Sequence, residues 1–178
     1  MKTEYKQWLE RTKFDLSRPC RPVDTSTNKT YEEFVEEFKA IIIEGLVSRN
    51  FEVNDNFPNE TKFLMASKED IFILVLCELK ERNLVSHSKS GIKRKIGIND
   101  VKIMSRKCSA LGVFGAIITD KYRKHSAKSK AKELNVLITD PTEALSKLSK
   151  FVVEKIDERE EEALAECLSK LVLEQDEI

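Results

Sequence analysis

Hydrophobic positions along the chain change period several times, and each change predicts a secondary-structure element. Between 30 and 50, apolar side chains recur every three or four residues, as they do on one face of a helix. The stretch IFILVLCELK at 71–80 instead begins with seven consecutive apolar residues, which is typical of a strand buried on both faces. The segment TKFLMA at 61–66 precedes it across the polar tetrapeptide SKED. Together these two segments predict a β-hairpin with a four-residue loop.

Downstream of the hairpin, the pattern alternates between helix and strand. Asn99 or Asp100 can cap a helix that Gly112 would end, and Pro141 suits the first position of a long final helix. The further expected elements are a short strand at 51–53, a helix at 101–112, a strand at 114–119, a helix at 126–134 and a strand at 135–139. A hairpin that leads into alternating helices and strands predicts an α/β fold with a mixed sheet covered on both faces.

A length of 178 residues fits one domain with terminal appendages. Residues 1–29 read as a short amphipathic helix and a proline-containing linker, and 30–150 as the core. Residues 151–178 read as an acidic C-terminal helix, with a break near 156–159.

The composition excludes several classes of protein. No apolar run approaches the roughly 18 residues of a membrane span. The charged N-terminal segment is unlike a secretory signal, and four cysteines are scattered without C-x-x-C spacing. We therefore expect no membrane partner and an intracellular location, in the cytoplasm or the nucleus.

The formal net charge of zero conceals a strong separation of charge. Thirteen basic residues lie between 89 and 132, against Asp100 and Asp120 alone, whereas ten acidic residues face three basic ones between 154 and 178. A concentrated basic region can bind a polyanion on a neutral protein, because the local potential governs the encounter. The alternative is an ordinary solvated, lysine-rich surface.

Glu78 and Lys80 end the apolar run, and alternate residues of an extended chain share a side. An ion pair at a strand end is one interpretation of this pair. The element order closed by E-x-K nevertheless resembles the core of the PD-(D/E)XK nuclease superfamily, which has the restriction-endonuclease-like fold. The stretch at 110–145 resembles the second half of its Mrr-type and Holliday-junction-resolvase-like members. The resemblance covers about 30–150.

This resemblance implies a metal-dependent nuclease acting on DNA. Glu78 would bind Mg²⁺ or Mn²⁺, and Lys80 would position or activate the attacking water. A further acid is needed on the preceding strand, where Glu60 is nearest and Asp55 less direct. We expect the residue opposite Glu78 to be near position 59, and Lys62 stands where the family has aspartate. Glu37 or Glu44 on the first helix are further candidates, and the spacing does not choose between them.

The alternative to a nuclease is a catalytically inactive module of the same fold that binds nucleic acid or assembles with protein partners. The C-terminal helix offers a surface for a homodimer or another partner through Leu164, Leu168, Leu171 and Val172. In either case, phosphate contacts are expected from basic side chains after the third strand, and these would position nucleic acid without reading its sequence. The expected contacts are Lys93, Arg94, Lys95, Arg106, Lys107, Lys121, Arg123 and Lys124.

Overall fold

The computed structural model describes residues 31–57, 60–79 and 95–176. The expected N-terminal helix and linker lie outside the described residues, and so do Lys80, Lys93 and Arg94.

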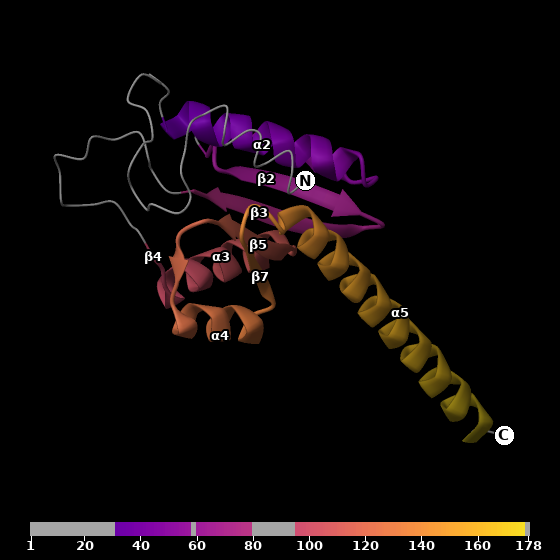
Figure 1. The fold of residues 1–178 in the computed structure, drawn as a ribbon. Coiled ribbons are helices and arrows are strands. Elements are labelled where there is room, and N and C mark those ends of the chain that lie inside the picture. Colours follow the sequence, from indigo (N-terminus) through magenta and orange to yellow (C-terminus); the bar gives the residue numbers. More distant parts are fainter. Residues whose placement is uncertain (1–30, 58–59, 80–94, 177–178) are drawn as a thin grey trace.

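A mixed five-stranded sheet forms the centre of the fold (Figure 1). Its strands, in spatial order, are β1 (Glu52–Asn54), β2 (Phe63–Lys68), β3 (Ile71–Glu78), β5 (Phe114–Thr119) and β7 (Val136–Thr139). Pairing is antiparallel from β1 to β3 and parallel from β3 to β7. The α/β class and the mixed sheet predicted from the pattern are confirmed. A second, two-stranded parallel sheet joins β4 (Lys95–Ile96) to β6 (Tyr122–Arg123), which the pattern did not predict.

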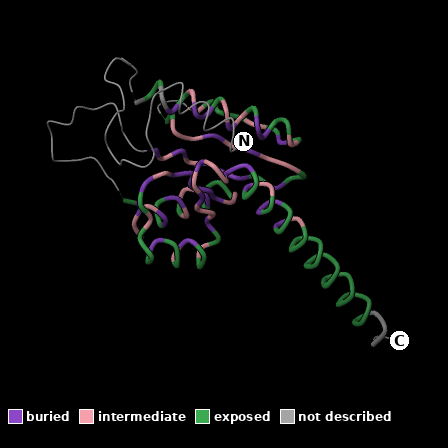
Figure 2. Tube along the Cα trace, in the orientation of Figure 1, coloured by how far each residue is buried: buried purple, intermediate pink, exposed green. Residues whose placement is uncertain are grey.

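Helices cover both faces of the sheet, as Figures 1 and 2 show. α2 (Tyr31–Val47) and α5 (Ala144–Asp176) lie on one face, and α3 (Ile98–Leu111) and α4 (His125–Glu133) on the other. Successive side chains of β3 alternate between these two cores. Val75 and Cys77 pack with α2 and α5, whereas Leu74 packs with α3 and α4. β3 is therefore buried on both sides, as its apolar run predicted.

Two glycines allow the helices to pack and end where they do. Gly45 of α2 lies against Leu145 of α5 so closely that an added Cβ would lie 2.1 Å from Leu145 Cδ1. Gly112 ends α3 in the left-handed conformation (φ 67°), and its N–H bonds the carbonyls of Cys108 and Ser109. The prediction that Gly112 ends this helix is confirmed.

The β2–β3 turn differs from the one expected. Lys68 pairs directly with Ile71, so the turn contains only Glu69 and Asp70 rather than four residues. Both have positive φ, at 49° and 64°, as a two-residue hairpin turn demands. The backbone N–H of Cys77 donates to the carbonyl of Lys62 at 2.8 Å and extends the ladder by one pair. This register puts position 61, rather than 59, opposite Glu78.

α5 is a single helix of 33 residues, without the expected break near 156–159. It begins at Ala144 rather than at Pro141, because Asp140 Oδ1 accepts hydrogen bonds from the N–H groups of Thr142 and Glu143 in the preceding turn. Its first half packs on the sheet, and every residue from 157 to 173 is exposed on a segment that leaves the domain (Figure 2). None of the described helices is both long and apolar enough to cross a membrane.

Candidate functional site

Glu78 lies at the carboxyl end of β3, beside Thr119 at the carboxyl end of β5. The two strands are parallel, so the chain leaves the sheet at the same edge from both. In open α/β sheets, ligands bind outside the carboxyl ends of the parallel strands. Glu78 alternates with Cys77, so its side chain lies on the face that α3 and α4 cover.

Two lysines from other segments of the chain hold the Glu78 carboxylate. The Lys121 ammonium lies 2.7 Å from Glu78 Oε1, and the Lys62 ammonium lies 3.4 Å from each carboxylate oxygen. Lys121 follows β5, where its backbone N–H donates to Thr119 Oγ1 at 3.0 Å. Lys62 precedes β2. Three separate segments thus place one acid between two cations.

Burial explains why Lys121 needs this partner. The Lys121 side chain is 5% exposed and that of Glu78 is 19% exposed, whereas that of Lys62 is 38% exposed. An ammonium removed from water is costly unless an opposite charge compensates it. Glu78 therefore stabilises the buried Lys121 directly, and Lys62 adds a weaker, more solvated contact.

The other expected acids lie apart from this cluster. Glu60 pairs with the Lys107 ammonium of α3 at 2.6 Å, and the same ammonium lies 4.4 Å from the centre of the Phe63 ring. Asp55 is exposed in the turn after β1. Glu37 and Glu44 belong to α2, which packs on the opposite face of the sheet from Glu78.

The described residues do not fit a magnesium or manganese site at Glu78. In the described part of the chain, no group of three or more His, Cys, Asp or Glu residues is placed to hold a metal ion. Mg²⁺ requires several oxygen ligands in near-octahedral geometry, whereas the described charged groups that contact the Glu78 carboxylate are two ammonium groups. Two positive neighbours oppose the binding of a dication there.

A small cavity of about 110 Å³ adjoins Glu78. Asp100 and Lys107 of α3 line it with Glu78, together with apolar side chains such as Ile96 and Met104. Asp100 Oδ2 accepts the backbone N–H of Gly97 at 2.8 Å and so caps the start of α3. One of the two carboxylates at this cavity is therefore engaged in the helix cap, and the other with lysines.

Cys77 lies on the opposite face of β3, in the core beneath α2. Burial raises the pKa of its thiol to about 12, against a smaller lowering by the Lys39 ammonium of α2. A thiol of this pKa is protonated at neutral pH and is a poor nucleophile. Cys77 is therefore a core residue, as its apolar position suggested.

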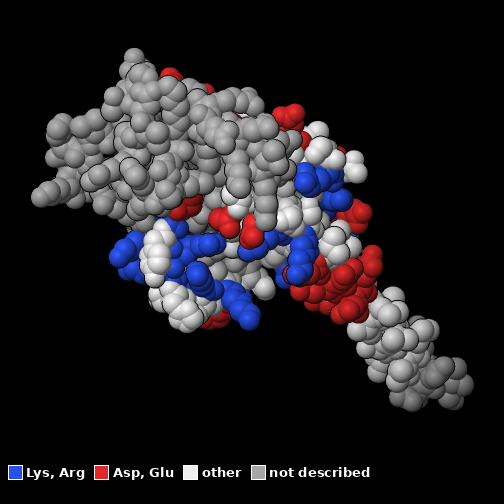
Figure 3. Space-filling model, viewed as in Figure 1, with Lys and Arg blue, Asp and Glu red and all other residues white. Residues whose placement is uncertain are grey.

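The basic residues of 95–132 divide into paired and unpaired groups. Lys107, Lys121 and Lys130 are engaged with Glu60, Glu78 and Glu133 respectively. Figure 3 shows lysine and arginine side chains gathered over the part of the molecule where α3 and α4 lie. Among the residues from 95 to 132, all of them described, the cations that make no ion pair are Lys95, Lys102, Arg106, Arg123, Lys124, Lys128 and Lys132.

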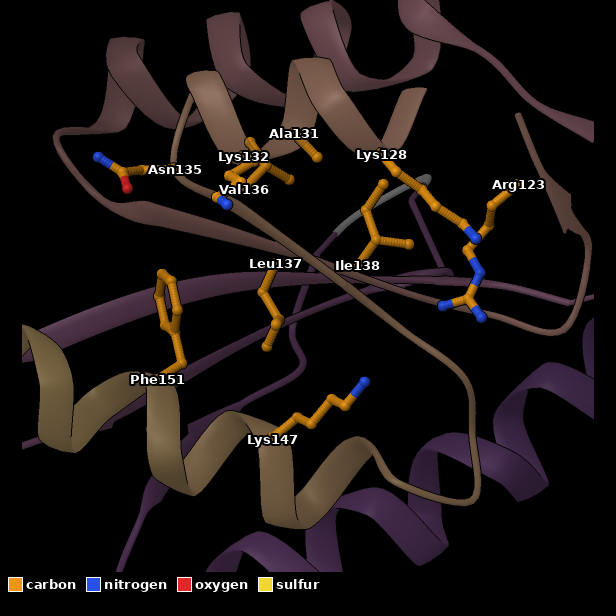
Figure 4. A pocket seen from close by; sticks show the side chains of 10 residues that line it. All are labelled: Arg123, Lys128, Ala131, Lys132, Asn135, Val136, Leu137, Ile138, Lys147 and Phe151. Atoms are coloured by element: carbon orange, nitrogen blue, oxygen red, sulfur yellow. The ribbon is translucent and has the colours of Figure 1, made fainter. Parts of the chain in front are cut away.

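A groove of about 490 Å³ runs along β7, between α4 and α5 (Figure 4). Its apolar lining includes Leu137, Ile138 and Phe151. Four cations line it as well: Arg123, Lys128, Lys132 and Lys147. In Figure 4, Lys128 extends toward Arg123 at one end, and Lys147 extends from α5 toward the strand. We refer to this feature as the β7 groove.

Sequence reasoning missed both Lys121 as the partner of Glu78 and the β7 groove. The position of Lys121 two residues after a strand parallel to β3 was a usable signal, because parallel strands end at the same edge. The spacing of Lys128 and Lys132, four residues apart on one helix, was another. Neither signal identifies a partner until strand order and register are known.

Comparisons with known proteins leave the family open. No family model matches this sequence, and neither does any curated protein. One solved structure with a partly similar backbone is described as the crystal structure of a protein of unknown function, AF1548. It shares 13% sequence identity, with a TM-score of 0.43, over 59% of this chain and 58% of that one. The chain thus spans less than two thirds of that structure, and a likeness at this level carries no conclusion about fold family or function.

Proposed function

We propose that this protein is a nucleic-acid-binding module of restriction-endonuclease-like fold that does not cleave its ligand. The observation that carries the proposal is the set of cations on β4 and α3, with Lys124 just before α4, that lack an ion pair within the described chain. Lysine and arginine side chains of this kind bind phosphates and release the counterions condensed on nucleic acid. The binding this produces depends strongly on salt and little on sequence.

The surroundings of Glu78 support a role without catalysis. Lys121 and Lys62 occupy the space around the carboxylate that a metal ion and further acids would need. Glu60 is bound to Lys107 instead. In this proposal, Glu78 keeps the position that the nuclease family uses for chemistry and has become the counter-ion of a buried lysine.

The order of elements supports the finer assignment of fold. A helix precedes three antiparallel strands, and the third of these is followed by helix, strand, helix and strand in parallel with it. This is the order from which the resemblance to the PD-(D/E)XK superfamily arose.

Fluorescence anisotropy with labelled duplex and single-stranded DNA and RNA tests the proposal, measured over a series of salt concentrations. We expect the affinity to fall steeply with salt. Replacing Arg106 and Lys124, both exposed, with glutamine should weaken binding and reduce the log–log salt slope by about 1 for each phosphate-binding side chain removed.

Lys150→Gln is the matched control, because it removes one exposed charge from α5, away from α3 and α4. Its affinity should equal that of the wild type. A protein that binds none of these nucleic acids at low salt would overturn the proposal, and so would equal losses of affinity in the control and the test variants.

A metal-dependent nuclease is the second candidate, favoured by the placement of Glu78 at the carboxyl end of a central strand, two residues before Lys80 in the sequence. It predicts cleavage of DNA in Mn²⁺ or Mg²⁺ that Glu78→Gln abolishes while nucleic-acid affinity is kept. Cleavage by the wild type with this loss would replace the first proposal. Binding without cleavage on duplex, flap, junction and single-stranded substrates would exclude the second.

A further inference from the structure

The β7 groove has the features of a site for an acidic, partly apolar segment. β7 is the last strand in the order of the five-stranded sheet, and α4 and α5 form the two walls beside it. The floor is apolar, with Leu137 and Ile138 of β7. On the walls, Arg123, Lys128 and Lys132 have no ion pair with any described residue, and Lys147 has one with Glu143 of its own helix turn.

The distal half of α5, defined here as residues 157–173, has the complementary features. All of it is exposed, and its apolar side chains are among the most exposed of their kind in the described chain. Leu164, Leu168 and Leu171 are 61%, 54% and 56% exposed and follow one another at helical spacing, so they form a stripe. Six acidic residues and two basic ones accompany this stripe.

Acidic side chains flank the start of this stripe. Glu160 and Glu161 precede Leu164 by four and three residues, so they lie on the same helix face. The distal half of α5 thus presents leucines and carboxylates together, whereas the β7 groove presents an apolar floor and cations together. An isolated helix of this length gains little stability in water without a packing partner.

The distal half cannot reach the groove of its own chain. Phe151, which lines the groove, and Leu171 belong to the same unbroken helix. Twenty residues at 1.5 Å each separate them by roughly 30 Å, and α5 leads directly away from the domain (Figure 1). Only a second molecule can therefore bring this segment into the groove.

We propose that the distal half of α5 from one copy of this chain docks in the β7 groove of a second copy, and that the exchange is reciprocal. The leucine stripe packs on the apolar floor, while Glu160 and Glu161 face the cations of the walls. Each copy contributes one helix and one groove, so a two-fold axis closes the assembly as a dimer.

Charge reversal on each side of the contact tests this arrangement. Light scattering after size exclusion should give the full-length wild type twice its chain mass of 20.5 kDa. Lys128→Glu/Lys132→Glu and Glu160→Lys/Glu161→Lys should each give the single mass, because each places like charges together. All four residues are exposed, so the folds of both variants should be retained, as circular dichroism can verify.

Mixing the two variants should restore the double mass, since each heterodimer pairs an acidic helix with a basic groove and a basic helix with an acidic groove. Lys102→Glu/Arg106→Glu, two exposed reversals on α3, is the matched control and should remain dimeric. Leu164→Gln/Leu168→Gln/Leu171→Gln should be monomeric.

Several outcomes would overturn the proposal. A wild type that is monomeric at 100 μM (about 2 mg/ml) would show that the distal half of α5 does not dock in the groove of a second copy. If the leucine substitutions break the dimer but the groove reversals do not, the two copies associate by packing their α5 helices on each other and not through the groove. If the wild type is monomeric and Lys128→Glu/Lys132→Glu loses nucleic-acid binding, the groove binds a polyanion and not the distal half of α5. Binding through Arg106 and Lys124 is measured separately, so failure of the dimer is distinguishable from failure of the proposed function.

Discussion

The Lys121 ammonium and the Glu78 carboxylate meet at 2.7 Å across the carboxyl ends of two parallel strands. Forty-three residues separate them in the chain, yet the register of β3 and β5 makes them neighbours. The lysine is nearly buried and the glutamate partly so. An acid that the sequence places in a catalytic motif with Lys80 therefore has a stabilising role that is independent of any chemistry.

Removal of Glu78 should lower the stability of the protein more than removal of Lys121 does. Glu78→Ala leaves the Lys121 ammonium buried without its acid, and we expect it to lower the free energy of unfolding by about 3–5 kcal/mol. Lys121→Met should cost less, because Glu78 retains Lys62 and some exposure to water. Urea denaturation monitored by circular dichroism measures both.

The double variant Glu78→Ala/Lys121→Met should recover much of the loss, since neither charge is then buried. Strictly additive effects in this double-mutant cycle would show that the two side chains are not coupled.

The turn between β2 and β3 offers a stabilising change. Glu69 and Asp70 both have positive φ, a conformation that costs about 1–2 kcal/mol for most residues other than glycine and less for asparagine and aspartate. Asn-Gly is the preferred pair for such a turn. We expect Glu69→Asn/Asp70→Gly to raise the midpoint of thermal unfolding.

The hydrogen bond from Arg159 Nη1 to the Glu69 carbonyl, 3.0 Å long, involves only the backbone of the turn and should survive. Glu69→Ala is the control, because it removes the side chain and keeps the unfavourable φ. A gain of equal size in this control would contradict the explanation through backbone conformation.

Gly45 should resist substitution even by alanine. Alanine favours a helix over glycine by about 1 kcal/mol. The new Cβ would however lie 2.1 Å from Leu145 Cδ1 and 3.1 Å from its Cγ, in a core where Leu145 is 1% exposed. Overpacking of this kind costs about 1–3 kcal/mol, so Gly45→Ala should destabilise the protein on balance.

Chemical denaturation of Gly45→Ala, Leu145→Ala and the double variant checks the cause of this loss. The double variant should lose less stability than the sum of the single variants, because Leu145→Ala removes the atoms that the new Cβ at position 45 would meet. A stabilised Gly45→Ala would mean that helix propensity outweighs the α2–α5 packing.

Most of the fold could be predicted from local patterns. The strand at 114–119 matches β5, and the left-handed Gly112 ends α3 as expected, because apolar runs and glycine have direct local causes. The turn at Glu69 and Asp70 could not be predicted in this way. Glutamate does not prefer positive φ, although aspartate tolerates it, and the pairing of the strands imposes that conformation on both residues.

The site was less predictable, because it depends on register. A change from four turn residues to two moves the position opposite Glu78 from near 59 to 61, which brings Lys62 rather than Glu60 beside the carboxylate. Lys121 reaches the same carboxylate only because β5 lies next to β3. Proximity between distant segments of this kind is set by packing, which single-sequence periodicity does not encode.

The buried thiol of Cys77 should make the protein lose stability at alkaline pH. Burial raises its pKa from 9.0 to about 12 in the folded protein. Below pH 9 the thiol is protonated in both states and contributes nothing to the pH dependence. Between pH 9 and 12 the unfolded chain releases this proton while the folded chain keeps it, so the free energy of unfolding falls as pH rises. Urea denaturation at pH 7 and at pH 10 should show a smaller fall for Cys77→Ala than for the wild type, with the other alkaline groups common to both. Equal falls would mean that the thiol does not remain protonated in the folded protein.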